Sequence, residues 1–475
     1  ENCIDSVLFV NGLPIATIEF KNNLTGSTIK HAEKQYRTDR SPAGEPLLTF
    51  KRGALVHFAV DEYNVSMTTR LQNGATRFLP FDRGRDGGAG NPDIAGEFRI
   101  AYLYADQPDG PAIFGRQTLL TILGKYLHIE KSEETGIESL IFPRFQQLDA
   151  VLELMAHARA HGSGQNYLIQ HSAGSGKSNT IGWTAHQIIN LHDDLDQRLF
   201  DTAIVVTDRV ILDRQLQGAI AQFEQTPGLV KKIDGTSSQL KTALESGARI
   251  IVSTIQKFGT EHLQTLTGQS RKRFALIVDE AQDIGTAHQA VLGQLAGAGV
   301  QVSLIGDPNQ GIYEFAGADG SFLRSYAASG TAQSFGLTRN FRSVPSIVEV
   351  ANAISGRADV AVRETPSIYH GAYFAVYAKG QEAKLVEAFQ LAVKRAELDL
   401  AKSAVICRAT KLANSLAGGS AAVGQGIPKA LTEAAILRDK NGDFVEAFNI
   451  VAGCAVALLA KPPDLLIAQI PQPHR

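Results

Sequence analysis

The chain has 475 residues, of which 46 are Lys or Arg and 48 are Asp or Glu, so its formal net charge is −2. This length allows two to four domains, and the near-neutral charge means that any binding of nucleic acid depends on local patches rather than on the overall field. The three cysteines, Cys3, Cys407 and Cys454, lie far apart without metal-ligand spacing, which argues against a disulfide framework or zinc site and favours a reducing, cytoplasmic compartment.

No leader-like segment opens the sequence, so we expect no signal peptide. The longest apolar stretch, residues 448–460, is too short to cross a bilayer, which takes roughly 20 residues. We therefore expect no membrane span, and interpret this stretch as a core helix.

Two β-type segments, residues 7–10 and 15–20, are joined by a turn sequence and predict a hairpin. Asp5 precedes the first segment, and Glu19 and Lys21 end the second on one face, because side chains alternate along a strand. Two carboxylates and a lysine suit Mg²⁺-dependent cleavage of a phosphodiester. A solvated strand end with an ion pair is the alternative.

The segments "IDSVLFVNGLPIATIEFKN", "QYRTDRSP", "FKRGALVHFAVDEYNVSMTTRL" and "FLPFDRGRDGGAGNP" resemble the N-terminal endonuclease region of the motor (restriction) subunit of type I restriction enzymes. The resemblance implies a PD-(D/E)xK nuclease domain over residues 1–130, truncated at its N-terminus. It makes Asp5, Glu19 and Lys21 catalytic, with Asp5 and Glu19 as metal ligands. Gln35 and Tyr36 would support the site from the following helix. The Gly-rich residues 83–92 are expected to form a surface loop.

The segment "NYLIQHSAGSGKSNT", residues 166–180, predicts a phosphate-binding loop between a short strand and a helix. Backbone N–H groups of such a loop close around phosphates at the helix N-terminus. His171 stands where the general pattern has its first glycine. A chance loop is the alternative. The residues expected to bind ATP or its Mg²⁺ are Gly174, Ser175, Gly176, Lys177 and Ser178.

Four further apolar runs, residues 203–206, 250–253, 275–278 and 302–305, predict strands of a parallel sheet buried on both faces. Together with the loop they predict a RecA-like α/β motor domain over residues 131–335. Asp279 and Glu280 end the third run. Asp279 is expected to hold Mg²⁺, and Glu280 to polarise the attacking water.

Three other segments of this region resemble the restriction motor subunit. In "FPRFQQLDAV" the resemblance implies that Gln147 reads adenine, with an exposed helix glutamine as the alternative. In "AIVVTDRVILDRQL" and "IIVSTIQKF" it implies loops that face DNA, with ordinary strand-end polarity as the alternative. The candidate DNA-backbone contacts are Thr207, Arg209, Thr254 and Gln256.

From about residue 275 the resemblance changes. "VDEAQD", "SLIGDPNQGIYEFAGA", "LTRNFRS" and "SAVICRAT" resemble UvrD-like superfamily 1 helicases, whereas residues 1 to about 274 resemble the restriction subunit. The second resemblance implies that Gln310 senses the γ-phosphate, Tyr313 lies near the DNA path and Arg342 stabilises transition-state charge. Loop, packing or surface roles are the alternatives. A natural, misassembled or constructed hybrid would each explain the junction.

Residues 336–475 predict a helix-rich, partial second motor domain, with a loop at 417–428. The segment lacks a late superfamily 1 motif with paired arginines, so we expect ATP binding with weak hydrolysis and poor unwinding.

The leading interpretation is an ATP-dependent DNA translocase with an attached Mg²⁺-dependent endonuclease, as in the restriction subunit of type I systems. Its cofactors are ATP and Mg²⁺. Its expected partners are double-stranded DNA and, by resemblance, methylation and specificity subunits. A superfamily 1 repair helicase and an inactive nucleotide-binding fragment are the alternatives.

Overall fold

The structure is a computed structural model, and it describes residues 3–457 with gaps. The gaps are residues 86–89, 109, 132–135, 172–174, 209–215, 219, 224–227, 234, 259–261, 263–265, 267–271, 312–317, 319, 364, 366–370, 379, 401–402, 408–411, 414–415, 417–430, 432–433, 436 and 442–443. The chain divides into two compact units, Glu1–Pro366 with His370–Ala372, and Ser367–Tyr369 with Tyr373–Arg475.

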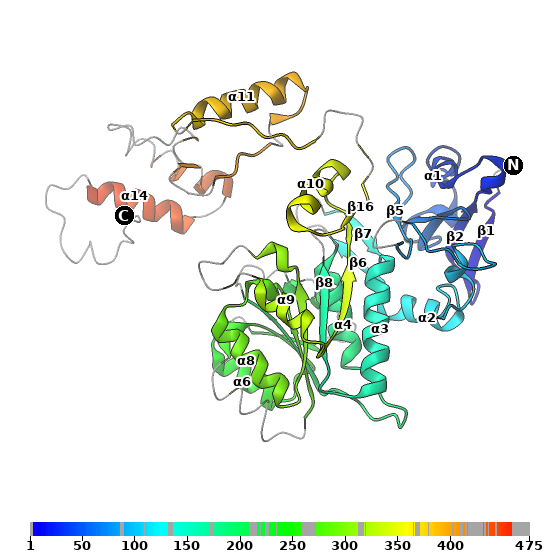
Figure 1. The fold of residues 1–475 in the computed structure, drawn as a ribbon, viewed down its shortest axis with the longest axis horizontal. Coiled ribbons are helices and arrows are strands. Elements are labelled where there is room, and N and C mark those ends of the chain that lie inside the picture. Colours follow the sequence, from blue (N-terminus) through cyan, green and yellow to red (C-terminus); the bar gives the residue numbers. More distant parts are fainter. Residues whose placement is uncertain are drawn as a thin grey trace. The chain divides into compact units, whose positions relative to one another are not determined.

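A five-stranded mixed sheet forms the N-terminal part of the first unit (Figure 1). Its strands, in spatial order, are β1 (Ser6–Val10), β2 (Leu13–Phe20), β3 (Val56–Val60), β4 (Val65–Thr68) and β5 (Leu79–Pro80). Strand β2 is parallel to β3 and the other pairs are antiparallel. Asn11 and Gly12 both have positive φ, as a tight two-residue hairpin turn requires. The predicted hairpin is confirmed, and helix α1 (Ile29–Thr38) packs on β2 and β3.

The motor part is a seven-stranded sheet in which every neighbouring pair is parallel. Its strands, in spatial order, are β10 (Val230–Lys232), β11 (Ile250–Thr254), β9 (Thr202–Thr207), β12 (Phe274–Val278), β13 (Gln301–Gly306), β8 (Asn166–His171) and β14 (Ala332–Leu337). All five predicted strands are confirmed, in the α/β arrangement expected of a RecA-like helicase domain. Strand β14 crosses the domain boundary expected at 335, so residues 336–337 complete this sheet.

Both faces of the motor sheet are buried, which explains why its strands are apolar without interruption. Helices α3 (Phe145–His161) and α4 (Lys177–Ile188) share a core with alternate strand residues such as Ile169 and Val205. The other alternate residues, such as Leu168 and Ile204, share a second core with α6 (Ser237–Glu245), α8 (Thr286–Gly297) and α9 (Ser321–Ala328). Helices therefore cover the sheet on its two sides.

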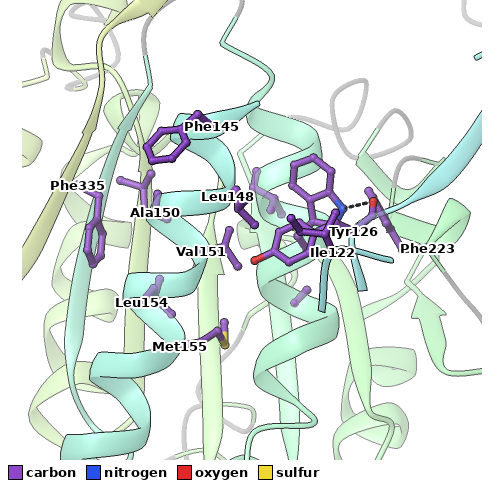
Figure 2. Close-up of a cluster of buried hydrophobic side chains, with 14 of the residues drawn as sticks. Ile122, Tyr126, Phe145, Leu148, Ala150, Val151, Leu154, Met155, Phe223 and Phe335 are labelled. Carbon is purple, nitrogen blue, oxygen red and sulfur yellow. Dashed lines mark hydrogen bonds between the residues drawn. The ribbon is translucent and has the colours of Figure 1, made fainter. Parts of the chain in front are cut away.

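One of the hydrophobic cores runs continuously from the N-terminal sheet into the motor. Phe58 of β3 packs edge-on against Phe142, and Phe81 packs edge-on against both Phe142 and Phe145, the first residue of α3. Figure 2 shows the apolar side of α3 lying between Phe335 on one side and Ile122, Tyr126 and Phe223 on the other. The chain around the domain boundary expected at residues 130–131 is therefore packed rather than an open linker. It consists of α2 (Arg116–Lys125) and the hairpin of β6 (His128–Lys131) and β7 (Glu138–Ile141).

The first unit ends with β15 (Arg339–Asn340), α10 (Pro345–Ser355) and β16 (Val360–Ala361), in which β15 and β16 pair in parallel. The second unit contains α11 (Glu382–Arg395), the π-helical turn η9 (Leu437–Asn441) and α14 (Phe444–Ala457). Helices α10, α11 and α14 confirm the predicted helix-rich character of this region. The interpretation of residues 448–460 as a core helix is wrong for Phe448 and Val451, which are exposed. The loop expected at 417–428 lies outside the described residues. Within the described part of the chain, no helix combines the length and apolar character needed to cross a membrane.

Candidate functional site

The predicted phosphate-binding loop lies between β8 and α4, and Lys177 is the first residue of the helix. Gly176 caps it in the left-handed conformation, with φ of 87°. A side chain at this position would be strained by that φ and would overlap the Gln147 amide. Ser175 is buried and Ser178 is exposed at the helix start, whereas Gly174 lies outside the described residues.

His171, at the end of β8, contacts this loop through a side-chain hydrogen bond. Its side chain is buried, and Nδ1 lies 2.6 Å from Ser175 Oγ. Burial, with the positive charges of Lys177 and Arg144, lowers the pKa of His171 to about 3. The imidazole is therefore neutral at physiological pH and serves as a hydrogen-bond partner of the loop.

Asp279 and Glu280 follow β12 and meet Lys177 at the same edge of the sheet. Lys177 Nζ lies 2.7 Å from Glu280 Oε1 and 3.7 Å from Asp279 Oδ1. Strands β8 and β12 are not neighbours, because β13 lies between them. The three side chains thus meet across the end of β13, which is the arrangement that a shared nucleotide site requires.

The electrostatics of this site suit a cation. Asp279 is 7% exposed, and burial raises its pKa to about 6, although Lys177 lowers it and Glu280 raises it further. A buried carboxylate beside a second acid is a good oxygen donor for a divalent ion. Asp279 and the exposed Ser178 are the residues that would hold Mg²⁺ here, and the ion would neutralise phosphate charge.

Gln282 connects Glu280 to the end of β13. Its Nε2 donates a hydrogen bond to Glu280 Oε2, and its Oε1 accepts one from the Asp307 N–H at 3.1 Å. Glu280 itself has φ of 49°, in the left-handed region. At Gly306 a Cβ would overlap Gln282 Oε1, so the glycine makes room for this bridge.

Gln310, the predicted phosphate sensor, belongs to the same edge. It lies in the short helix η6 (Pro308–Gln310), and its Nε2 donates to Asp307 Oδ2 at 2.8 Å. Arg342 is exposed, and its recorded contacts are local, from its N–H to Asn340 Oδ1 and from Arg363 Nη1 to its carbonyl. Tyr313 lies outside the described residues.

Gln147 lies beside the loop, but both ends of its amide are used within the protein. Its Oε1 accepts from the Arg144 N–H at 3.0 Å, and its Nε2 donates to the Gly176 carbonyl at 2.9 Å. It also lines a cavity of about 380 Å³, whose wall includes Asn179 and Phe341. The alternative of an exposed helix glutamine is wrong, because Gln147 is buried.

The residues expected to contact DNA are differently placed. Thr207 and Thr254 are buried at the ends of β9 and β11. Gln256 is exposed, and its Nε2 donates to Asp208 Oδ1 at 2.6 Å. Arg209 lies outside the described residues.

A second acidic site lies in the N-terminal sheet. Glu19 is fully buried, and Arg40 Nε donates to its Oε1 at 2.6 Å, while Arg40 Nη2 donates to the Cys3 carbonyl. Asp5 is held by the Phe20 N–H, which donates to its Oδ2 at 2.8 Å. Burial raises the pKa of Glu19, Arg40 lowers it, and the nearby Asp5 raises it. The two predicted acids are therefore neighbours.

The chemistry of this site fits a cation. Glu19 Oε2 is buried and has no hydrogen-bond partner within the part of the chain that the structure describes. A buried carboxylate oxygen without a donor is an open ligand position. Glu19 and Asp5 are the residues that would hold Mg²⁺. The described residues contain no cluster of three or more His, Cys, Asp or Glu suited to a metal.

Tyr36 lies behind Glu19 on the same sheet face. Its hydroxyl lies 2.8 Å from Thr17 Oγ1, which also lies 2.7 Å from His57 Nδ1. Lys21 is half-buried, and its N–H donates to the Val60 carbonyl at 2.9 Å. Gln35 contributes its carbonyl to the end of α1, where it accepts from the Asp39 N–H at 2.8 Å.

The sequence analysis assigns no role to three residues that contact the site residues, namely Arg40, Asp307 and Arg357. Arg40 forms an ion pair with Glu19, and Arg357 forms one with Asp307. Arg40 lies past the end of α1, where helical spacing no longer predicts direction. Asp307 could have been singled out, since it directly follows an apolar strand as Asp279 does. Arg357 follows a glycine beyond α10, and no local pattern indicates its partner.

Comparison with protein families gives two matches. Residues 146–300 match the SWI2/SNF2 ATPase family, and residues 1–75 match the N-terminus of the type I restriction enzyme R protein. The first match covers the phosphate-binding loop and the acid pair, and the second covers Asp5, Glu19 and Arg40. The motor part is thus similar to helicase-type ATPases, and the N-terminal part is similar to restriction R proteins.

Among curated proteins, a Methanocaldococcus jannaschii protein named "Putative type I restriction enzyme MjaIXP endonuclease subunit" is 23% identical over 303 residues, which cover 62% of this chain and 27% of that protein. The "ATP-dependent DNA helicase UvrD2" of Mycobacterium tuberculosis is 36% identical over 91 residues, 19% of this chain and 13% of that helicase. The chain therefore spans about a quarter or less of the length of these relatives.

Among solved structures, the UvsW helicase from bacteriophage T4 aligns with a TM-score of 0.31 and 16% identity, covering 47% of this chain and 68% of that one. A second structure of T4 UvsW aligns with a TM-score of 0.32 and 14% identity, covering 69% and 60%.

Proposed function

We propose that the chain is an ATP-dependent DNA translocase whose N-terminal part is a Mg²⁺-dependent endonuclease, as in the restriction subunit of type I restriction-modification systems. The observation that carries the proposal is the position of Lys177 beside Asp279 and Glu280 at one sheet edge. A lysine at a helix N-terminus facing two acids matches the requirements of nucleoside triphosphate hydrolysis. The matches to the ATPase and restriction R families support both parts.

In the motor, Lys177 binds the β- and γ-phosphate oxygens of ATP, and the α4 N-terminus stabilises their charge. Binding draws Lys177 away from Glu280, since the phosphates compete for the same ammonium group. Glu280 then accepts a proton from the attacking water. Gln310, held by Asp307, lies at the edge where it can respond to the γ-phosphate.

In the N-terminal sheet, Asp5 and Glu19 would hold Mg²⁺, which would neutralise charge and activate water for attack on a phosphodiester. Arg40 opposes the effect of burial on the pKa of Glu19 and fixes its carboxyl group in place. Lys21, two residues after Glu19, orients the phosphate.

The proposed partners are double-stranded DNA and the methylation and specificity subunits of a restriction-modification complex, in the cytoplasm. The name of the M. jannaschii relative supports such a complex. Sequence recognition would belong to the other subunits, so this chain would contact DNA mostly through phosphates, with salt-sensitive affinity.

A superfamily 1 helicase is the second candidate. The local identity to UvrD2 favours it. A hybrid of the two motor types, with a junction near residue 274, would combine both resemblances.

The test is DNA-stimulated ATP hydrolysis and plasmid cleavage by the whole chain. We expect Lys177→Ala to abolish both, and Glu19→Ala to abolish cleavage while sparing hydrolysis. Lys231→Ala, on the exposed edge strand β10, is the matched control and should change neither. Hydrolysis that survives Lys177→Ala would contradict the motor, and cleavage that survives Glu19→Ala would contradict the nuclease.

Two activators separate the candidate motors. Blunt duplex DNA should stimulate a restriction-type translocase, whereas 3′-tailed DNA should stimulate a superfamily 1 helicase. Because residues 336–475 are expected to form a partial second motor domain, we expect this chain to turn over below about 10 per second, a typical enzyme value. Faster turnover would show that the paired-arginine motif, which was not found in residues 336–475, is not required for ATP hydrolysis.

A further inference from the structure

Arg357 connects the segment after α10 to the strand that lies between the two nucleotide-binding strands. Its Nη1 lies 2.7 Å from Asp307 Oδ1, and its Nη2 lies 2.8 Å from Asp359 Oδ1. Asp307 directly follows β13, between the ends of β8 and β12. The guanidinium thus forms ion pairs with two carboxylates, one of them at the edge of the motor sheet.

Asp307 is the centre of the contacts behind Glu280. Its Oδ1 also accepts from the Asn309 N–H at 3.0 Å, and its Oδ2 accepts from Gln310 Nε2 at 2.8 Å. Its N–H donates to Gln282, which in turn donates to Glu280. A continuous series of polar contacts therefore runs from Arg357 to the acid that we assign to water activation.

Because Asp307 is buried, its carboxylate depends on the positive charge of Arg357. Asp307 is 4% exposed, and the Arg357 side chain is 16% exposed. A buried carboxylate that loses its cationic partner either binds a proton or turns toward water, and either change alters the groups bonded to it. Burial also raises the pKa of Asp359, and Arg357 counteracts it. The planar guanidinium binds both carboxylates through separate N–H groups, and the single ammonium group of a lysine would do this less well.

We propose that Arg357 is a positioning residue for ATP hydrolysis, acting through Asp307 on Gln310 and, by way of Gln282, on Glu280. This inference rests on the proposed ATPase function. It gives the segment from α10 to β16 a direct influence on the hydrolytic geometry, because Arg357 moves with that segment. Asn352 fixes the segment locally, since its Nδ2 donates to the Asp359 carbonyl at 2.7 Å and its Oδ1 accepts from the Asp359 N–H at 3.0 Å.

The kinetic test compares Arg357→Ala, Arg357→Lys and Asp307→Asn in the whole chain. We expect Arg357→Ala to lower kcat about tenfold or more while the Kd for ATP changes less than about threefold, because the contacts lie behind Glu280 rather than on Lys177. Arg357→Lys should restore part of kcat. Arg357→Ala added to Asp307→Asn should have little further effect, since the two act in one series of contacts. Glu349→Ala, at an exposed charged residue on α10, is the control.

A second measurement does not depend on turnover. Amide hydrogen exchange in residues 279–284 and 306–311 should be faster in Arg357→Ala than in wild type, with β12 itself unchanged. Equal exchange in both peptides, or a kcat equal to wild type, would overturn the inference. If the wild-type chain hydrolyses no ATP, the proposed function fails, and the exchange result alone decides whether Arg357 holds this edge.

Discussion

Lys177 and Glu280 form an ion pair in which Nζ and Oε1 are 2.7 Å apart, across the end of an intervening strand. The residue proposed to bind phosphate is thus paired with the residue proposed to activate water. In this proposal ATP competes with Glu280 for the ammonium group, and this competition has a measurable consequence.

Glu280→Gln removes the charge that competes with phosphate and also removes the general base. We therefore expect ATP to bind at least as tightly as to wild type, while hydrolysis falls about 10²- to 10⁴-fold. Equilibrium binding of ATP and single-turnover hydrolysis check the two parts. Weaker binding together with normal hydrolysis would remove Glu280 from its assigned role.

Gly176→Ala tests the loop geometry. Its φ of 87° is strained for any residue with a Cβ, and the added methyl would overlap the Gln147 amide. We expect ATP affinity to fall on the order of tenfold or more, the result of losing about 1.4 kcal/mol.

Gly124→Ala in α2, where a Cβ meets no atom within 4 Å, is the control and should bind ATP normally. Adding Gln147→Ala to Gly176→Ala should recover only part of the affinity, since the backbone strain remains. Full recovery would mean that the overlap alone matters.

Arg40→Ala tests the N-terminal acidic site. It leaves Glu19 buried without its cation, which costs roughly 3–5 kcal/mol for a buried pair. We expect loss of plasmid cleavage and earlier unfolding of the N-terminal sheet by hydrogen exchange, with ATP hydrolysis less affected. Lys34→Ala, at an exposed cationic residue of α1, is the control. Normal cleavage by Arg40→Ala would mean that Glu19 needs no ion pair to function.

His57 makes the N-terminal sheet sensitive to acid. Burial lowers its pKa from 6.5 to about 4. Between pH 6.5 and 4, His57 is therefore protonated in the unfolded chain but neutral in the folded chain. Its contribution to stability is complete above about pH 6.5 and is lost as the pH falls toward 4, by about 3 kcal/mol in total.

His57→Gln should remove this part of the pH dependence. Exchange of the β3 amides, corrected for intrinsic rates, should accelerate between pH 6.5 and 4 in wild type and less in the variant. An identical pH dependence in the two proteins would show that His57 accepts a proton without unfolding the sheet.

The strands of the motor were predictable because burial on both faces leaves an uninterrupted apolar run, and the strand, loop and helix around Lys177 are local in sequence. The meeting of Lys177 with Glu280 followed from the rule that parallel strands end at one edge. These features depend on neighbours along the chain or on a single geometric rule.

Partners from distant segments were not predictable in the same way. Arg40 reaches Glu19 from beyond the end of a helix, and Arg357 reaches Asp307 from a turn 50 residues later. Gln147 was singled out for adenine, yet its amide is bonded to Arg144 and Gly176. Such contacts depend on how packed elements bring backbone and side chains together.

The aromatic contacts from Phe58 through Phe142 and from Phe81 to Phe145 have a practical consequence for dissecting the chain. Separating the first 130 residues from the rest would expose apolar surface on both fragments, so both fragments should tend to aggregate in solution. In the proposed function, the nuclease and the ATPase are therefore parts of one packed unit, and the motor would have to bring DNA to the nuclease.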